Sequence, residues 1–387
     1  MKKFLIALMF MMAQMLGAQT LESCDPAPNA ATDKQTVERL RKLVVDKNFS
    51  ALEDELGDRL KRYDAGQYSD LELYWLIKNT VSKADVSFDP ILKQWVKERP
   101  QQLMARLVKA EYHIAMAYAK RGKEFAEETS AEQMQAMNAE FEKAAQEIKV
   151  AMDISSKSSL VRATLMEIIR ARGGREAARM LYMDAQEADP LNQSVRWAAI
   201  SALDQRWGGR PEDMEWLLDQ FAKSPLSPSR KRALQWKVEM IRAQHFQNIT
   251  KEKTKAIAQY RKAATICDSS DVLWQMSRAA NDLEDWPVVV EVMTSYLTLK
   301  SDESRPYTRR GWALEKQGKL PEATADYQKA ADLGDAWAQN KLGYMYAKGQ
   351  GVTKDIPRAR QLLQAAAAQG NTNAQAHLQW LGAQKEQ

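Results

Sequence analysis

The fold is decided near the end of the chain by two stretches, PEATADYQKAADLGDAWAQNKL (residues 321–342) and PRARQLLQAAAAQGNTNAQAHL (residues 357–378). Residues recur between them at a constant offset of thirty-six positions, so that Pro321 returns as Pro357 and Leu342 returns as Leu378. Repetition at a fixed period of this length is typical of a solenoid, in which each helix pair buries its apolar face against neighbouring pairs. We therefore predict an all-α protein, an α-α superhelix built from antiparallel helix pairs.

A second set of spacings also predicts tightly packed helix pairs. Glycine is followed by alanine, by tyrosine four positions later and by a further alanine, and this order occurs at Gly173, Ala178, Tyr182 and Ala185 and again at Gly318, Ala323, Tyr327 and Ala330. Small side chains let two helices cross closely, and an aromatic ring fills the space behind the crossing. The pattern therefore predicts that both tyrosines fill gaps between helices.

These spacings resemble those of the tetratricopeptide repeat. The stretch AWAQNKLGYMYAKGQGV (residues 336–352), followed by Asp355 and by AAAAQG (residues 365–370), resembles the Sel1-like repeat, a thirty-six-residue relative of the tetratricopeptide repeat. In the second copy Gln379 stands where the first has Gly343, a departure that suits a terminal cap. The resemblance implies stacked helix pairs near the end of the chain, with the first helix of each pair lining a concave face.

The preceding part of the chain, residues 36–222, resembles a family of bacterial helical domains to which no function is assigned. The residues that carry this resemblance are Phe49, Leu52 and Glu53, the segment 177–190, and RWGG (206–209) followed by Phe221 and Ala222. We therefore divide the chain into an N-terminal helical domain over residues 36–245 and C-terminal tetratricopeptide and Sel1-like repeats over residues 246–387.

The first residues of the chain predict export. Two lysines at positions 2–3 precede an uncharged, largely apolar run over residues 4–16, and small residues follow at positions 17–18, which is the pattern of a signal peptide. We assign residues 1–18 to a signal peptide and residues 19–35 to a flexible leader, and we expect a periplasmic or secreted protein of a Gram-negative bacterium. No later segment approaches about 18 consecutive apolar residues, so we expect no transmembrane helix.

The two cysteines of the chain, Cys24 and Cys267, leave two possibilities open. In an oxidising compartment they could form a disulfide. Alternatively, LESC (residues 21–24) is a lipoprotein cleavage site, with Cys24 acylated and the protein tethered to the outer membrane. That stretch shares only its leucine and serine with such sites, Glu22 is atypical, and the apolar run ends several residues too early. We therefore favour a protein without a lipid tether.

The charged and metal-binding residues predict no catalytic site. The net charge is +5, and loss of the two lysines in residues 1–18 lowers it to +3. A net charge of +3 attracts a nucleic acid only weakly. The three histidines, His113, His245 and His377, lie far apart, and the chain has no His-Glu-x-x-His or Cys-x-x-Cys motif. We therefore expect a non-enzymatic protein with no cofactor, no metal ion and no nucleic-acid partner.

The string RWGGR (residues 206–210) has two interpretations. In the first it is a binding corner, where Trp207 stacks on a ligand and the two arginines pair with an acid. In the second it is a helix end, because glycine supplies the left-handed conformation that ends a helix and the tryptophan plugs the junction. We favour the second interpretation.

Large aromatic and arginine side chains of the repeats are the candidate binding residues. With Ser277, Gly311, Gly343 and Gln379 aligned as the tightly packed position, the next residue of each repeat is expected to face the groove. Three further groove-facing positions complete the candidate set, which is Trp274, Arg278, Arg305, Trp312, Trp337, Tyr344 and Trp380. Exposed aromatic and arginine side chains are typical anchors of protein interfaces, although the tryptophans could instead fill gaps between repeats.

These features predict an exported scaffold that binds a protein or peptide in the concave groove of its repeats. The alternative is an accessory factor of the cell envelope that binds glycan or peptidoglycan, with tryptophans stacked on the sugars. Tryptophan fluorescence that responds to peptides or to muropeptides would distinguish the two.

Overall fold

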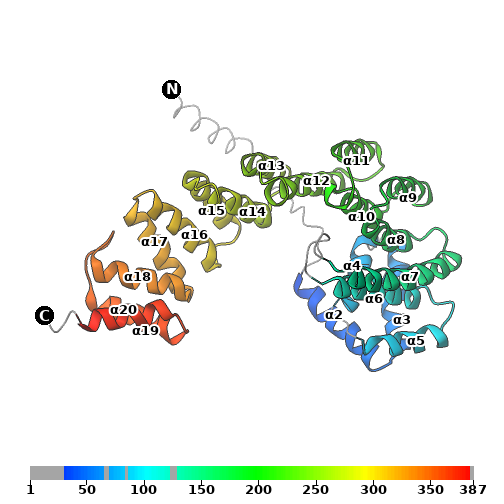
Figure 1. Ribbon diagram of the computed structural model, residues 1–387, viewed down its shortest axis with the longest axis horizontal. Helices are drawn as coiled ribbons and strands as arrows, with labels where there is room; N and C mark the ends of the chain where they lie inside the picture. The colour runs from blue at the N-terminus through cyan, green and yellow to red at the C-terminus, as the bar shows by residue number, and fades with distance from the viewer. Residues whose placement is uncertain (1–29, 65–68, 83–85, 123–128, 384–387) are drawn as a thin grey trace. The chain divides into compact units, whose positions relative to one another are not determined.

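The computed structural model (Figure 1) describes residues 30–64, 69–82, 86–122 and 129–383. Within these ranges all regular structure is helical and no β-strand occurs, so the predicted all-α class is confirmed. The chain divides into two compact units, one over residues 23–241 and the other containing residues 242–387. We call them the N-terminal unit and the repeat unit. The predicted signal peptide, most of the predicted leader and Cys24 lie outside the described residues.

The N-terminal unit is built from helices that surround a continuous apolar core. They are α2 (Ala30–Val45), α3 (Phe49–Asp64), α4 (Asp70–Val81), α5 (Phe88–Glu98), α6 (Leu103–Arg121), α7 (Ala131–Ile154), α8 (Ser159–Ala171), α9 (Arg175–Ala188), α10 (Ser194–Ala202), the 3-10 turn η1 (Gln205–Trp207), α11 (Pro211–Lys223) and the first part of α12 (Pro228–Asn248). The long helix α6 packs against α7 and also contacts α3, α4, α5 and α8. Its apolar face, which includes the fully buried Val108 and Ala117, therefore lies at the centre of this unit.

The start of α7 shows how local sequence sets a helix boundary. Ser130 Oγ accepts a hydrogen bond from the backbone N–H of Gln133 at 3.2 Å, and Gln133 Oε1 accepts one from the N–H of Ser130 at 2.9 Å. This reciprocal capping box satisfies backbone donors that have no partner within the helix. It fixes the first residue of α7 at Ala131.

The start of α10 is capped instead by a residue distant in sequence. Asp70, at the first position of α4, is 1 % exposed and accepts hydrogen bonds from the N–H of Gln193, at 3.0 Å, and from both the N–H and the hydroxyl of Ser194, at 3.0 and 2.6 Å. A carboxylate near a helix N-terminus also interacts favourably with the helix dipole. Asp70 therefore joins α4 to α10 through groups that would otherwise lack partners.

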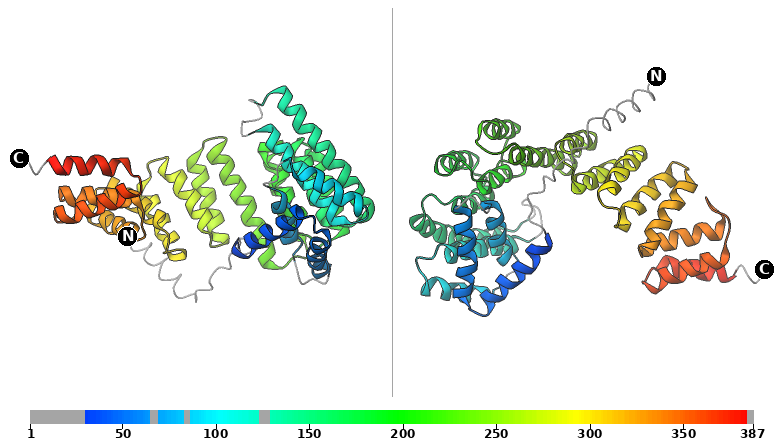
Figure 2. Two further views of the ribbon diagram at one scale, coloured as in Figure 1. Left: turned by 90° about the horizontal axis from the view of Figure 1, so that it is seen from below. Right: turned by 180° about the vertical axis from the view of Figure 1, so that it is seen from behind.

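The repeat unit begins with the last part of α12 and continues as a series of helices in chain order (Figure 2). They are α13 (Lys253–Ile266), α14 (Ser270–Asn281), α15 (Trp286–Leu299), α16 (Ser304–Lys316), α17 (Leu320–Asp332), α18 (Ala336–Lys348), α19 (Ile356–Ala368) and α20 (Thr372–Ala383). Each of them packs against the next, both within helix pairs and between adjoining pairs. This is the solenoid arrangement that the thirty-six-residue offset predicts.

Small residues set the close approach of the helices in the repeat unit. A Cβ atom added at Gly343 would lie 2.8 Å from Leu363 Cγ and 3.1 Å from the carbonyl oxygen of Ala359, so α18 and α19 need glycine there. Gly311 approaches the ring of Tyr327 in the same way, at 2.9 Å from Cε1. Tyr327 is fully buried, and so is Tyr182 in the N-terminal unit. The prediction that these two tyrosines fill gaps between helices is confirmed.

Candidate functional site

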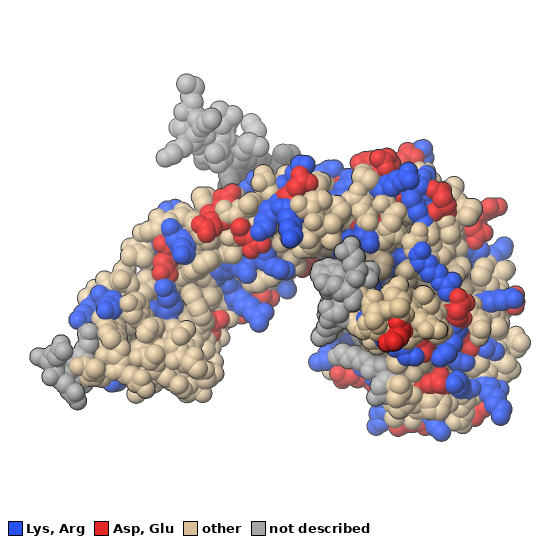
Figure 3. Space-filling model, viewed as in Figure 1, with Lys and Arg blue, Asp and Glu red and all other residues tan. Residues whose placement is uncertain are grey.

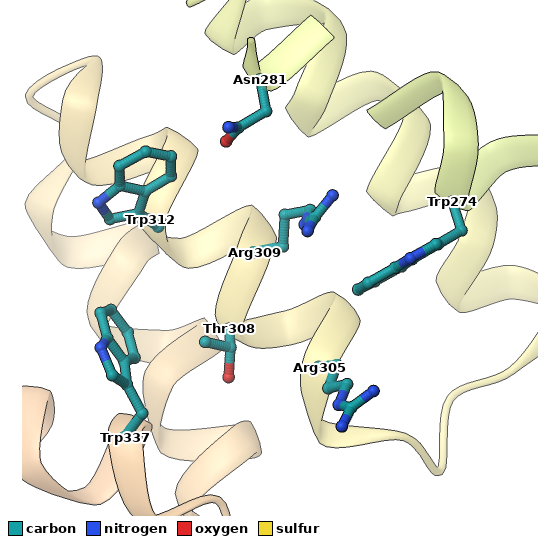
Figure 4. A pocket seen from close by; sticks show the side chains of 7 residues that line it. All are labelled: Trp274, Asn281, Arg305, Thr308, Arg309, Trp312 and Trp337. Carbon is teal, nitrogen blue, oxygen red and sulfur yellow. The ribbon is translucent and has the colours of Figure 1, made fainter. Parts of the chain in front are cut away.

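An open pocket of about 440 Å³ lies in the repeat unit, along the first helices of three successive pairs (Figure 4). Its lining comes from α14, α16 and α18, and consists of Trp274 and Asn281, then Arg305, Thr308, Arg309 and Trp312, then Trp337. The residues from α16 recur at intervals of three and four positions, so they share one face of that helix. The pocket therefore combines side chains from three repeats.

Each tryptophan of this pocket also packs edge-on against a second aromatic ring. The distances between ring centres are 6.1 Å for Trp274 and Tyr296, 4.9 Å for Trp312 and Trp286, and 5.6 Å for Trp337 and Tyr327. Edge-to-face contacts of this kind hold aromatic rings in place. Trp337 nevertheless remains 40 % exposed. Each ring therefore packs between helices and also lines the pocket.

Three arginines give this surface its charge. The guanidinium carbon of Arg309 lies 4.2 Å from the centre of the Trp274 ring, and its Nη1 donates a hydrogen bond to Ser277 Oγ at 3.0 Å. Burial lowers the pKa of Arg309, and the positive charge of the neighbouring Arg278 lowers it further. Among the described residues, no carboxylate oxygen lies within 4.0 Å of a guanidinium nitrogen of Arg278, Arg305 or Arg309, so none of the three forms an ion pair. The surface therefore carries positive charge that no ion pair neutralises, although the charge of Asp282 acts on Arg309 and partly opposes the fall in its pKa.

The predicted candidate residues fall into two groups. Trp274, Arg305, Trp312 and Trp337 line the pocket together, whereas Arg278, Tyr344 and Trp380 do not. Arg278 lies close enough to Arg309 to change its pKa, so it contributes charge beside the pocket. Tyr344 and Trp380 form a separate aromatic cluster between α18 and α20, with ring centres 6.1 Å apart and Lys348 Nζ 4.2 Å from the centre of the Trp380 ring.

Sequence reasoning missed three lining residues, Asn281, Thr308 and Arg309. All three carry a signal that could have revealed them, since Asn281 lies seven positions after Trp274 and the other two lie three and four positions after Arg305. Residues at these intervals share one face of a helix. An alignment of a few positions in each repeat does not reveal them, because they depend on the whole face of α14 or α16.

The remaining reactive groups are dispersed. His113 Nδ1 is 2.7 Å from Glu140 in the N-terminal unit, and His377 Nδ1 is 2.9 Å from Asn340 Oδ1 in the repeat unit. Among the described residues, no group of three histidine, cysteine, aspartate or glutamate side chains is arranged to hold a metal ion. Basic and acidic side chains intermix on the face shown in Figure 3.

No helix in the described part of the chain combines the length and the apolar composition that crossing a membrane requires.

Two segments of the chain match known families. Residues 327–335 and 338–371 match the Sel1 repeat. The Sel1 match includes most of α18 but not Trp337, which lies between the two matched ranges, and α14 and α16 lie upstream of the match. Residues 36–196, within the N-terminal unit, match the Domain of unknown function (DUF4034).

Solved structures of low sequence identity also resemble this chain. A protective antigen of uropathogenic Escherichia coli with an SLR fold is 17% identical to this chain. The match covers 89% of this chain and 76% of the antigen, with a TM-score of 0.35. A Sel1 repeat protein from Oxalobacter formigenes is 16% identical, with coverages of 80% and 93% and a TM-score of 0.24. Yeast Tom70 is 12% identical, with coverages of 93% and 90% and a TM-score of 0.32. These values support no functional argument. Comparison with curated proteins gives no match.

Proposed function

We propose that this protein is an exported, non-enzymatic scaffold that binds an acidic segment of a protein or peptide in the pocket of the repeat unit. The main support is that three tryptophans and two arginines, Arg305 and Arg309, converge on one open surface from three helices. Guanidinium groups without an acidic partner form strong hydrogen bonds to carboxylates. Partly exposed aromatic rings bury apolar side chains beside such contacts. Export rests on the signal-peptide pattern of residues 1–18.

The dimensions of the pocket suit a short segment better than a broad flat surface. Its volume of about 440 Å³ falls within the roughly 300–1,000 Å³ of typical ligand sites. Such a space holds a few side chains. A folded partner would therefore contact it through a protruding segment, with a carboxylate near Arg305 and an apolar group against the tryptophans.

Arg305→Glu is expected to weaken the binding of an acidic peptide by about tenfold or more, because it replaces an attractive charge with a repulsive one. Arg305 is exposed and forms no hydrogen bond, ion pair or ring contact with another described residue that would be lost. Peptides selected from a random display library on the full-length protein would be titrated calorimetrically, and circular dichroism would check the helix content.

Lys329→Glu is the matched control, because Lys329 is an exposed base of α17 that does not line the pocket. It makes the same charge reversal in the same unit and should leave affinity within about twofold. The proposal fails if both reversals weaken binding equally or if neither does. Muropeptides that bind where acidic peptides do not would instead favour the cell-envelope glycan alternative.

A further inference from the structure

The N-terminal unit contains a second pocket, which shares no residue with the pocket of the repeat unit. It has a volume of about 250 Å³ and lies where the end of α6, the start of α7, the end of α8 and the turn η1 meet. Tyr118 and Trp207 supply its aromatic walls, and Met134 and Met137 line it from α7. Trp207 belongs to the string RWGGR that the proposed function does not use.

The walls of this pocket are held by a stacked arginine. The guanidinium carbon of Arg170 lies 5.6 Å from the centre of the Tyr118 ring and 5.1 Å from the centre of the Trp207 ring. Arg170 Nη2 donates a hydrogen bond to Tyr118 Oη at 2.8 Å, and Arg170 forms an ion pair with Glu167 at 2.6 Å. Since these contacts already fix the two rings, a ligand would lose little free energy to ordering of the site.

The turn that carries Trp207 is equally constrained. The buried carboxylate of Asp204 accepts hydrogen bonds from the backbone N–H of Arg206, at 2.9 Å, and from Arg206 Nε, at 2.8 Å. Gly208 adopts the left-handed conformation, with φ of 91°, as the helix-end interpretation of RWGGR requires. That interpretation therefore describes the backbone, and the same backbone also places Trp207 and Arg206 at the pocket.

Size and composition together define what would fit. An apolar cavity of about 150 Å³ can hold benzene, and sites for drug-sized ligands begin near about 300 Å³. A volume of about 250 Å³ therefore suits one substituted aromatic ring. Methionine sulfur and aromatic walls favour such a ring. The described lining includes three arginines and no acidic residue. Arg206 pairs with Asp204 and Arg170 pairs with Glu167, but neither acid belongs to the lining, so the charged groups that face a ligand are guanidiniums and a negative substituent is favoured.

We propose that this pocket binds an aromatic ring that bears a carboxylate. The ring packs against Trp207 and Met134, and the carboxylate lies toward Arg206. Two sources present this chemistry: a free aromatic acid, or a polypeptide that ends in an aromatic residue. The proposal concerns the N-terminal unit and stands independently of the proposed function in the repeats.

The test uses calorimetric titration of the full-length protein with 3-phenylpropionate, its neutral analogue 3-phenylpropionamide and its non-aromatic analogue cyclohexanepropionate. The carboxylate of the aromatic compound is expected to bind at least about tenfold more tightly than either analogue. Equal affinity for 3-phenylpropionate and its amide, or no saturable binding of 3-phenylpropionate at millimolar concentration, would overturn the proposal.

Two substitutions of one half-buried residue place the binding at this pocket. Met134→Glu should weaken 3-phenylpropionate binding at least about tenfold relative to Met134→Gln, because the two variants differ only in a charge that repels the ligand. The affinity for the amide should be the same in both. Equal affinity of the two folded variants for 3-phenylpropionate would show that the ligand does not bind in this pocket.

A final titration separates the two sources with the tripeptide Gly-Gly-Phe. Tighter binding of the tripeptide than of 3-phenylpropionate supports a polypeptide C-terminus as the ligand, and weaker binding supports a free aromatic acid. Arg172→Gln is the control, because Arg172 is an exposed base that pairs with Glu142 and lies next to the pocket without lining it. This variant should leave all affinities unchanged. A loss in this variant equal to that in Met134→Glu would count against the proposal.

Discussion

Replacing Glu111 with glutamine is expected to stabilise the N-terminal unit by about 3 kcal/mol at pH 8 and to change its stability little at pH 4.5. Glu111 is 2 % exposed, and burial raises the pKa of its carboxyl group from 4.5 to about 7. The folded protein therefore keeps a proton on Glu111 that the unfolded chain has already lost. The stability that this proton contributes is fully present below about pH 4.5 and is lost as the pH rises through about 7.

The surroundings of Glu111 explain why its carboxyl is the one that stays protonated. It accepts a hydrogen bond from Thr164 Oγ1 at 2.8 Å and lies near the second buried carboxyl, Glu167, whose charge raises the pKa of Glu111 further. Burial also opposes the ionisation of Glu167, but Lys78, at 3.0 Å, and Arg170, at 2.6 Å, outweigh it and lower that pKa. Glutamine at position 111 keeps the acceptor for Thr164 and never ionises.

The measurement is urea unfolding of wild type and Glu111→Gln at several values between pH 4.5 and 8, followed by circular dichroism. The difference between the two proteins isolates Glu111 from His113, whose pKa burial lowers from its ordinary value of 6.5. Glu147→Gln is the matched control: burial raises the pKa of Glu147, but hydrogen bonds from Lys109 and Arg106 outweigh burial and lower that pKa below its ordinary value. That variant should lose stability by a constant amount from pH 5 to 8. A difference between wild type and Glu111→Gln that does not grow with pH would contradict the prediction.

The repeat unit and the buried network of Glu111 differ in how far the sequence predicts them. In a solenoid each helix contacts its neighbours in the chain, so spacings within about forty residues contain most of the packing information. This is why the roles of Gly343 and Tyr327 could be read from the sequence, and why four predicted residues come together in one pocket. The finer composition of that pocket required the helix faces themselves, because Arg309 occupies no special position in the repeat pattern.

Contacts in the N-terminal unit depend on helices that pair across long sequence separations. Glu111 meets Thr164, fifty-three positions away, and Asp70 caps Ser194, which is 124 positions away. No period in the sequence relates these residues, so a buried acid on a helix is indistinguishable there from one on a solvated face. The string RWGGR was recognisable as a helix end. Its position beside Tyr118 and Arg170, which makes it part of a pocket, depends on the tertiary fold.

Gly209→Ala is expected to destabilise the N-terminal unit by about 3 kcal/mol or more, because the added methyl group has no space. A Cβ atom at this position would lie 1.8 Å from the carbonyl oxygen of Leu203, which is backbone and cannot rotate away. The N–H of Gly209 also donates to the carbonyl oxygen of Asp204 at 3.2 Å, so the two segments are held at this distance. The turn would have to open.

Gly57→Ala provides the comparison, since it makes the same chemical change in the interior of α3 with no atom within 4 Å of the new Cβ. Alanine is favoured over glycine inside a helix, so this variant should gain about 0.5–1 kcal/mol. Urea unfolding at pH 7 measures both, and shifts of the same sign would show that Gly209 is not in close contact with Leu203. If Gly209→Ala still folds at low temperature, the opened turn should also move Trp207 and weaken 3-phenylpropionate binding, whereas Gly57→Ala should bind as wild type does.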